Sequence, residues 1–563
     1  MSLRGGPTAP VPDPGHEDLT PGDPGATNEA AARAEASAGR SAFSAQLIAA
    51  GIFLSRISGL LREAVFSNYF GASSAADAFR AALRMPNVLQ NLLGEGVLSA
   101  SFIPVYSELI ERGRKEEAGR VAGAIFALLT ALAGALALIG FLLAPVLVRV
   151  FTTGFYTDRF VDGRYDLTVS LVRIIFPMTG LLVLSAWALG VLNSHRRFFV
   201  PYVAPVLWST AMIATMLIFG SRLDTRSLAV ALAWGALVGG ALQFLVQLPW
   251  VFQVERSLRI RWDLRLEGVR TAVRNATPAI MGRGVVQLSG WFDLWLASFL
   301  AAGAVAVIGY AQMLYILPIS LFGMSVAAAE LPELARERGQ AGEVLRVRIN
   351  RGLEQIAFFV VPTFVGYIFI GDVIAGALYE RGEFSPYDTI LVWWTLGAFS
   401  LGLVASTATR LFSSAFFALH DTKTPARYAI ARVAVAAALG AGLMVVFDRW
   451  EIAPGKRLGA VGLALGAGFG AWLEWWLLRR SLAPRIGRVG AGGRNLGRML
   501  LAALLAAGVA RIVDWSLPQM PPLLTGMVVL PIFGGLYLLL ASWLGLDQAG
   551  RLFGRIRGRL RRP

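Results

Sequence analysis

Long apolar stretches recur along this chain, and they restrict its fold more than any other feature. Most are about 20 residues or longer, which is the length that an α-helix needs to cross the hydrocarbon core of a membrane. We therefore expect an all-α polytopic membrane protein with about 14 transmembrane helices, of which the longest should tilt or continue beyond the bilayer. The predicted spans are 44–69, 76–106, 121–148, 166–194, 200–220, 227–252, 272–301, 304–334, 350–378, 387–418, 425–447, 458–478, 499–513 and 522–545.

The composition supports a membrane protein and excludes several other classes. Apolar residues make up 56% of the 563 positions and the mean hydropathy is +0.59, which is more apolar surface than a soluble domain could bury. The net charge of +16 falls mainly between the spans, where membrane orientation and anionic lipids explain it better than nucleic acid does. Cysteine is absent and only three histidines occur, so disulfides and thiol catalysis are excluded and no metal site is expected.

The distribution of basic residues predicts the orientation. An even number of spans places both termini on one side of the membrane. With the N-terminus inside, the cytoplasmic segments hold roughly three times as many Arg and Lys as the outer ones, so both termini are expected in the cytoplasm. Residues 1–42 are polar and rich in Pro, Gly and Ala, which predicts a disordered tail. Residues 547–563 form a basic tail, which is either an amphipathic helix on the inner leaflet or a solvated segment.

A weak internal repeat predicts two lobes. His195 follows the fourth span, and His420 follows the tenth span 225 residues later. Sliding the first span by 227 residues places Arg283 on Arg56. In transporters built from such repeats, substrates bind between the halves. The predicted parts are a six-helix lobe at 43–252, a second six-helix lobe at 268–480 related by a pseudo-two-fold axis, and two additional helices at 494–546.

Ionisable residues in the first two spans make residues 43–108 the most informative stretch. A charged side chain inside the bilayer costs at least a few kcal/mol, so it usually faces a polar cavity on a substrate path. Arg80 and Arg84 are four residues apart, and two like charges at this spacing favour an anion between them. Asp77, Arg84 and Glu95 share one face if the helix is continuous. Alternatively, some of these arginines only reach the lipid headgroups. The ionisable residues are Arg56, Arg62, Glu63, Asp77, Arg80, Arg84 and Glu95.

The same stretch carries a resemblance to a known family. The matching residues include Ser55-Arg56, Gly59, Leu61-Arg62-Glu63, Tyr69-Phe70-Gly71-Ala72, Asp77-Ala78-Phe79, Pro86-Asn87 and Glu95-Gly96. Similar matches continue to about residue 480, among them Asp421-Thr422-Lys423-Thr424-Pro425. This pattern resembles the MurJ/MviN lipid II flippases, which are members of the multidrug/oligosaccharidyl-lipid/polysaccharide exporter superfamily.

The resemblance implies a transporter rather than an enzyme. Such a protein moves lipid II, the undecaprenyl-diphosphate-linked peptidoglycan precursor, from the inner to the outer leaflet of the bacterial cytoplasmic (inner) membrane. Two lobes would surround a cationic cavity and expose it alternately to each side, and the last two spans would form a groove for the polyprenyl tail. The expected partners are lipid II and membrane lipids, and the chain is expected to act as a monomer.

No cofactor is expected, although a coupling cation or the membrane potential could drive the transport. Three acids near span ends, Asp372, Glu330 and Glu474, could bind such a cation. Solvation at the membrane surface explains each of them better.

The expected substrate site combines cations and amides with supporting acids. Arginine suits a diphosphate because it stays protonated and binds phosphate oxygens in a bidentate way. Two arginines that are usual in the family are replaced here by Gln90 and Met313, and Arg283 could supply missing charge or pair with Asp293. The predicted substrate-binding residues are Arg56, Arg62, Arg80, Arg84, Asn87, Gln90, Glu95 and Arg283, and the supporting acids are Glu63, Asp77 and Asp293.

Two other functions fit parts of the pattern. The chain could export another lipid-linked oligosaccharide or drugs within the same superfamily, although the signature at 43–108 favours lipid II. A membrane glycosyltransferase acting on polyprenyl diphosphates would need a base or metal-holding acids, commonly on a sizeable outer loop, and the outer loops here are short. The chain has no G-x-x-x-x-G-K-[ST] motif, which argues against direct coupling to ATP.

Overall fold

The computed structural model confirms an all-α membrane protein. Within the described residues almost every segment is helical, because a segment inside a bilayer must satisfy its backbone hydrogen bonds internally. The predicted tail at 1–42 and residues 551–563 of the basic tail lie outside the described residues. The structure describes residues 50–157, 163–324, 326–327, 330 and 342–550, except for the side chains of 279, 281–289 and 342.

Within the described residues, helices overlap each of the predicted spans. The first described helix covers residues 50–70. The others are α2 (Ser74–Leu93), α3 (Glu95–Glu111), α4 (Lys115–Leu142), α5 (Ala144–Phe151), α6 (Thr153–Thr157), α8 (Arg164–Ser194), α9 (Phe199–Phe219), α10 (Thr225–Leu245), α11 (Leu248–Val254), α12 (Glu267–Ala297), α13 (Ala304–Pro318), the π-helix η1 (Ile319–Met324), α15 (Gly342–Phe369), α16 (Gly371–Tyr379), α17 (Pro386–Ser400), α18 (Leu403–Ala418), α19 (Lys423–Phe447), α20 (Gly459–Ile486), α21 (Gly493–Ser516) and α22 (Pro522–Trp543). A short hairpin pairs β1 (Glu451–Ala453) with β2 (Lys456–Arg457).

Fewer helices than expected are both long enough and apolar enough to cross a membrane. Among the described residues, eleven helices are long and apolar enough to cross a membrane, or twelve if α17 and α18, which are bent by 42°, form one span. The expected fourteen are therefore not confirmed. The description of helix 50–70 begins inside the first predicted span, and α12 carries charged and polar residues that lower its hydropathy.

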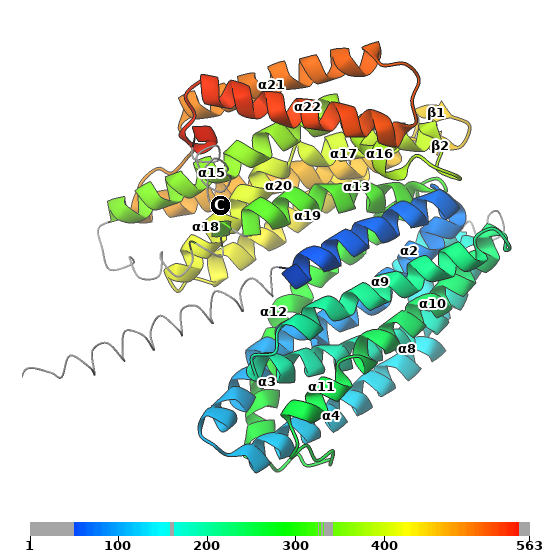
Figure 1. The fold of residues 1–563 in the computed structure, drawn as a ribbon, viewed down its shortest axis with the longest axis vertical. Helices are drawn as coiled ribbons and strands as arrows, with labels where there is room; N and C mark the ends of the chain where they lie inside the picture. The colour runs from blue at the N-terminus through cyan, green and yellow to red at the C-terminus, as the bar shows by residue number, and fades with distance from the viewer. Residues whose placement is uncertain (1–49, 158–162, 325, 328–329, 331–341, 551–563) are drawn as a thin grey trace, which may run out of the picture.

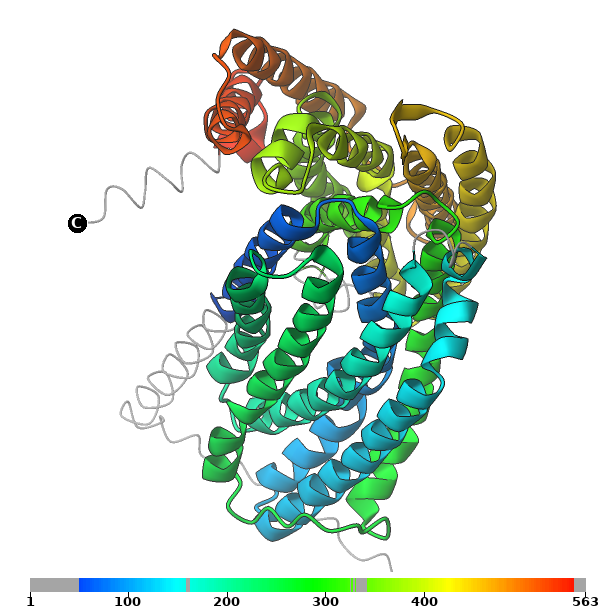
Figure 2. The ribbon, with the colours of Figure 1, turned by 90° about the vertical axis from the view of Figure 1, so that its right-hand side faces the viewer.

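The helices form three layers (Figure 1). Helix 50–70 and α2–α11 form the N-terminal lobe, and α13–α20 form the C-terminal lobe beside it. The hairpin of α21 and α22 covers the far side of the C-terminal lobe, where it packs on α15 and α16. The second view shows the same separation, with α21 and α22 remote from the N-terminal lobe (Figure 2).

Helix α12 does not pack as the predicted lobe boundary suggests. The boundary at 268 assigns it to the C-terminal lobe, but its beginning packs along α3 of the N-terminal lobe. Val269 and Ala272 are buried there in a cluster with Phe102 of α3 and Trp187 of α8. The last turns of α12 contact α19 and α20 of the C-terminal lobe as well as α5. Helix α12 therefore bridges the two lobes.

The second predicted span is interrupted, which changes the faces of its residues. Pro86 is accommodated inside α2, but the helix ends at Gly94 and α3 begins at Glu95. The backbone of Gly94 is extended, with φ −85° and ψ −150°, so the helical register is not continuous from Arg84 to Glu95. The expected common face of these two residues is therefore wrong.

The internal repeat is visible in how two helices end, but with a different register from the predicted one. Arg196 after α8 and His420 after α18 both have φ 59°, and they are 224 residues apart. In each case the next backbone N–H bonds back to the helix, Arg197 to the Leu192 carbonyl at 2.8 Å and Asp421 to the Phe416 carbonyl at 2.9 Å. Structurally, His420 thus corresponds to Arg196 rather than to His195.

The polar run Asp421-Thr422-Lys423-Thr424 after α18 has a structural explanation in this turn. The Asp421 carboxylate accepts hydrogen bonds from the Thr424 backbone N–H at 3.0 Å and the Thr424 hydroxyl at 2.8 Å, and it pairs with Arg485 at 2.7 Å. The bonds from Thr424 lower the pKa of Asp421 to about 2. This residue therefore fixes the start of α19.

The two lobes meet at the end of the molecule where β1 and β2 lie (Figure 1). We call this region the lobe contact. It is centred on Asp77, which is fully buried and accepts hydrogen bonds from the backbone N–H groups of Gly303 at 2.7 Å and Ala306 at 2.8 Å, at the start of α13. Arg164 of α8 pairs with the same carboxylate at 3.3 Å. Four further bonds complete it: Ser67 to the Tyr379 carbonyl, Glu383 N–H to the Asn68 carbonyl, Tyr310 to the Gly71 carbonyl, and the Lys456 ammonium to the Ala72 carbonyl.

Gly71 offers a test of the lobe contact. Its φ is +52°, and a Cβ at this position would lie 2.3 Å from the Glu383 carbonyl oxygen. Gly71→Ala should therefore lower the midpoint of thermal unfolding in detergent, because both backbone strain and a backbone clash oppose it. Gly113→Ala is the matched control, with φ +74° but nothing within 4 Å, and should cost only the strain, about 1 kcal/mol. Equal midpoints for the two variants would contradict this account.

Candidate functional site

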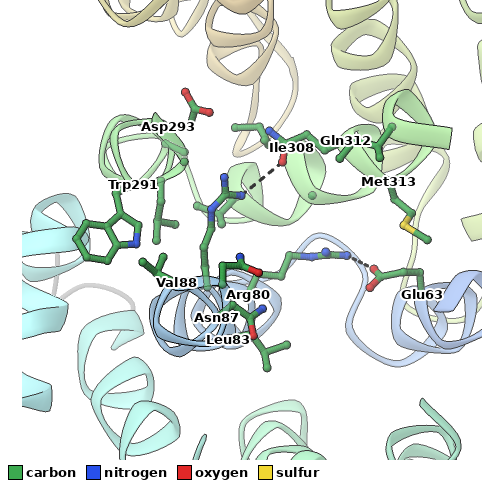
Figure 3. Close-up of a pocket in the computed structure, with 18 of the residues that line it drawn as sticks. Glu63, Arg80, Leu83, Asn87, Val88, Trp291, Asp293, Ile308, Gln312 and Met313 are labelled. Carbon is green, nitrogen blue, oxygen red and sulfur yellow. Dashed lines mark hydrogen bonds and ion pairs between the residues drawn. The ribbon is translucent and has the colours of Figure 1, made fainter. Parts of the chain in front are cut away.

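A polar cavity lies between the lobes, between helix 50–70 and α2 on one side and α12 and α13 on the other (Figure 3). Its volume is about 430 Å³. Both charged and apolar side chains line it, as expected for a site that must hold an ion inside a membrane. The lining residues are Arg62, Glu63, Arg80, Leu83, Arg84, Asn87, Val88, Asn91, Trp208, Gly290, Trp291, Asp293, Leu294, Ala297, Val305, Ile308, Gly309, Gln312, Met313 and Ile316.

Glu63 holds two of the cavity arginines. Its carboxylate accepts from Arg80 at 2.7 Å and from Arg62 at 3.2 Å. The Arg80 guanidinium also lies over the ring of Tyr310, with its central carbon 4.2 Å from the centroid, and Arg62 lies over Trp208 at 4.6 Å. Figure 3 shows the pair of Arg80 and Glu63 bridging the two helices. The charge of Arg80 is therefore largely neutralised inside the protein.

Arg84 is held far more weakly. It donates to the Gln312 side chain at 3.5 Å, which is the limit for a hydrogen bond. It interacts electrostatically with Asp293, but no carboxylate among the described residues lies within 4.0 Å of it. Gly290 makes room for it, since a Cβ there would lie 2.8 Å from its guanidinium nitrogen. Arg84 is therefore the cavity cation that is most available to an anion.

The structure separates the sequence-predicted residues into two groups. Those that line the cavity are Arg62, Glu63, Arg80, Arg84, Asn87 and Asp293. Four others do not line it: Arg56 and Glu95 are exposed, Gln90 is half-buried, and Asp77 belongs to the lobe contact. For Arg283, the structure describes the backbone in α12 but not the side chain, so its predicted role lies outside the described residues.

The sequence interpretation missed most of the other residues of the cavity, among them three with polar groups on helices outside the first two predicted spans. Trp208 of α9, Trp291 of α12 and Gln312 of α13 all line it. In the sequence, only the neighbouring Met313 stands out, as the replacement for an arginine that is usual in the family. Nothing in the local sequence of Trp208 indicates that it meets Arg62, because the two residues belong to different helices. One signal in the sequence could have indicated that α12 lines the cavity. Gly290 lies inside this helix, and the absence of a side chain there leaves space for the Arg84 guanidinium.

The three acids proposed for a coupling cation each pair with an arginine. Asp372 pairs with Arg511 at 2.7 Å. Glu330 pairs with Arg348 at 2.6 Å, and Glu474 pairs with Arg432 at 2.9 Å. In this conformation each carboxylate is therefore neutralised by the protein itself.

Comparison with solved structures identifies the fold. The structure titled "Lipid II flippase MurJ, inward closed conformation" matches with a TM-score of 0.71 and 23% sequence identity, covering 89% of this chain and 99% of that one. An inward-facing multidrug resistance MATE family transporter of the MOP superfamily matches with a TM-score of 0.60 and 18% identity, covering 76% and 95%. The fold is thus the two-lobed fold of these membrane transporters.

Sequence comparison is more specific and confirms the resemblance. A family described as "Lipid II flippase MurJ" matches residues 66–525. Relatives include a probable lipid II flippase MurJ from Rhizobium tropici, 33% identical over 78% of this chain and 83% of the relative. The lipid II flippase MurJ of Burkholderia cenocepacia is 31% identical, over 85% and 92%. The chain belongs to the MurJ family.

The contrast between Arg80 and Arg84 can be tested by stability. Glu63→Gln should lower the midpoint of thermal unfolding, because it leaves Arg80 buried without its ionic partner, a loss of several kcal/mol in buried pairs. The midpoint of Arg84→Gln should stay close to that of the wild type, since this substitution loses only the long hydrogen bond to Gln312. Both midpoints are measured on the purified chain in detergent. A larger loss for Arg84→Gln would refute the assignment of Arg80 as the neutralised cation.

Proposed function

We propose that this chain is a lipid II flippase that moves the undecaprenyl-diphosphate-linked peptidoglycan precursor from the inner to the outer leaflet by alternating access. The observation that carries the proposal is the arginine-lined cavity between the lobes, in a chain that belongs to the MurJ family. Family membership supports lipid II over another exported lipid or a drug. The chain acts as a transporter, not as an enzyme.

The cavity suits the diphosphate group. Arg62, Arg80 and Arg84 oppose Glu63 and Asp293, so the lining keeps a surplus positive charge. The diphosphate binds first to Arg84, whose guanidinium is not committed to an ion pair, and then competes with Glu63 for Arg80. The acids also limit the affinity, because they offer the arginines an alternative partner when the substrate leaves. A site that bound the diphosphate too tightly could not release it on the other side.

The size of the cavity supports alternating access. At about 430 Å³ it lies at the lower end of the range for small-molecule sites. A disaccharide-peptide headgroup needs more space, so the lobes have to part on one side to admit it. The lobe contact closes the side where β1 and β2 lie, and its bonds from the Gly303 and Ala306 N–H groups to Asp77 and from Lys456 to the Ala72 carbonyl must break for release there. Transport of two negative charges out of a negative interior is downhill by roughly 4–5 kcal/mol per 100 mV, so the membrane potential can drive it.

A cellular experiment tests the function. Depletion of the protein should reduce the lipid II exposed on the outer leaflet, and the wild-type gene should restore it. Arg84→Gln should fail to restore it, with exposure lowered at least about tenfold, because Arg84 is the cation that is free to bind the diphosphate. Arg274→Gln is the control, since Arg274 is exposed on α12 outside the cavity lining. Normal exposure after depletion would refute the function, and normal exposure with Arg84→Gln would refute the site.

The orientation gives a separate prediction. We infer that the protein lies in the bacterial inner membrane with both termini in the cytoplasm, which places the turn before α17 outside and the segment between α11 and α12 inside. The chain has no cysteine, so single cysteines can be introduced cleanly. Tyr387→Cys should react with an impermeant thiol reagent in intact spheroplasts, whereas Arg256→Cys should react only after lysis. Both positions are exposed. The reverse pattern would reject this orientation.

A further inference from the structure

A second group of charged side chains lies inside the C-terminal lobe, away from the cavity lining. Arg432 of α19 pairs with Glu474 of α20 at 2.9 Å. Arg410 of α18 follows Ser406 by four residues on the same face of that helix, and Ser406 is the hydrogen-bond partner of Tyr315 on α13, at 2.8 Å. We call Arg410, Arg432, Glu474 and Tyr315 the C-lobe cluster.

The C-lobe cluster holds more positive charge than its own acid can neutralise. Glu474 is buried and compensates one arginine. Arg410 is exposed and has neither an ion pair nor a hydrogen bond among the described residues, and Arg432 repels it. Arg410 lies eight residues before the end of α18, roughly 12 Å along the helix axis. An uncompensated charge at such a depth usually marks the path of a substrate.

The C-lobe cluster is continuous with the cavity. Asp293 lines the cavity and interacts electrostatically with Arg84 on one side and with Arg432 on the other. On α13, Gln312 bonds to Arg84, and Tyr315 lies one turn further along the same helix. The C-lobe cluster therefore borders the cavity through Asp293 and through the next turn of α13.

We propose that Arg410 and Arg432 form a second phosphate-binding subsite, on the C-terminal lobe, for a lipid diphosphate. The proposal rests on the proposed function and extends it: Arg84 holds one phosphate from the N-terminal side, and the C-lobe cluster holds the other. Glu474 positions Arg432, and Asp293 separates the two cationic groups while the cavity is empty. Because the two subsites lie on different lobes, binding of the diphosphate links both lobes to the same ligand.

The test compares ligands that differ by one phosphate. Undecaprenyl diphosphate and undecaprenyl monophosphate are titrated against the purified full chain in nanodiscs. The wild type should bind undecaprenyl diphosphate more tightly than undecaprenyl monophosphate. Arg410→Gln should weaken the binding of the diphosphate about tenfold, as loss of one charge-assisted contact would, and that of the monophosphate less than about twofold. The affinity of Arg410→Lys for the diphosphate should lie between those of the wild type and Arg410→Gln, since lysine keeps the charge but loses the bidentate geometry.

Control measurements keep the test decisive. Arg427→Gln, five residues before Arg432 on α19 and exposed, should bind both lipids as the wild type does. The midpoint of thermal unfolding should not change in Arg410→Gln, because Arg410 has no ionic partner to lose, whereas it should fall in Arg432→Gln. The subsite would be overturned if Arg410→Gln bound both lipids with wild-type affinity. It would also be overturned if the substitution weakened the binding of both lipids equally, because Arg410 would then be reaching the lipid headgroups rather than binding the second phosphate. Lipid II is the third ligand: if the wild type does not bind it, the proposed function itself fails.

Discussion

The carboxylate of Asp77 is the interaction on which the arrangement of the lobes depends. It is fully buried, which would cost many kcal/mol for an isolated charge, and it is compensated by Arg164 and by two backbone N–H groups at the start of α13. These partners come from both lobes, so the charge is stable only while the lobes are together at this end. This carboxylate is among the fully buried groups whose bonds close this side of the cavity. In the sequence Asp77 looks like a supporting acid of the binding site, but its position in the structure makes it part of the lobe contact.

Within the cavity, the acids decide which cations remain available. Glu63 binds both Arg80 and Arg62, and aromatic rings cover the two guanidinium groups, so much of their charge is satisfied without a ligand. Arg84 has only a long hydrogen bond and a distant carboxylate. A polyanion thus encounters a graded series of cations rather than a uniform patch. Such a series permits capture and release with modest changes in free energy, which a transporter needs more than high affinity.

Much of the fold could be predicted from hydropathy, because each helix had to be long and apolar on its own. The identity of the cavity residues was predictable in part, since Arg80, Arg84, Glu63 and Asn87 share two neighbouring helices. Glu95 was placed wrongly because the break at Gly94 depends on packing rather than on Pro86, which the helix accommodates. The partners of Asp77 and Arg62 could not be predicted, since Arg164 and Trp208 come from distant helices and a single sequence holds no record of such contacts.

The packing of α12 has a consequence for how the cavity opens. The seam between α12 and α3 lies at the end opposite the lobe contact (Figure 1), and it is closed by apolar side chains: Val269 and Ala272 of α12 are buried in one cluster with Phe102 of α3. Apolar contacts are non-directional, so two helices can slide past one another without losing all of them at once. Collective helix movements of this kind take place on the microsecond to millisecond timescale. The other end is held by directional bonds, among them those from the Gly303 and Ala306 N–H groups to Asp77, and these are either made or broken. The two ends of the cavity are therefore closed by different kinds of contact, one that yields gradually and one that yields in a single step.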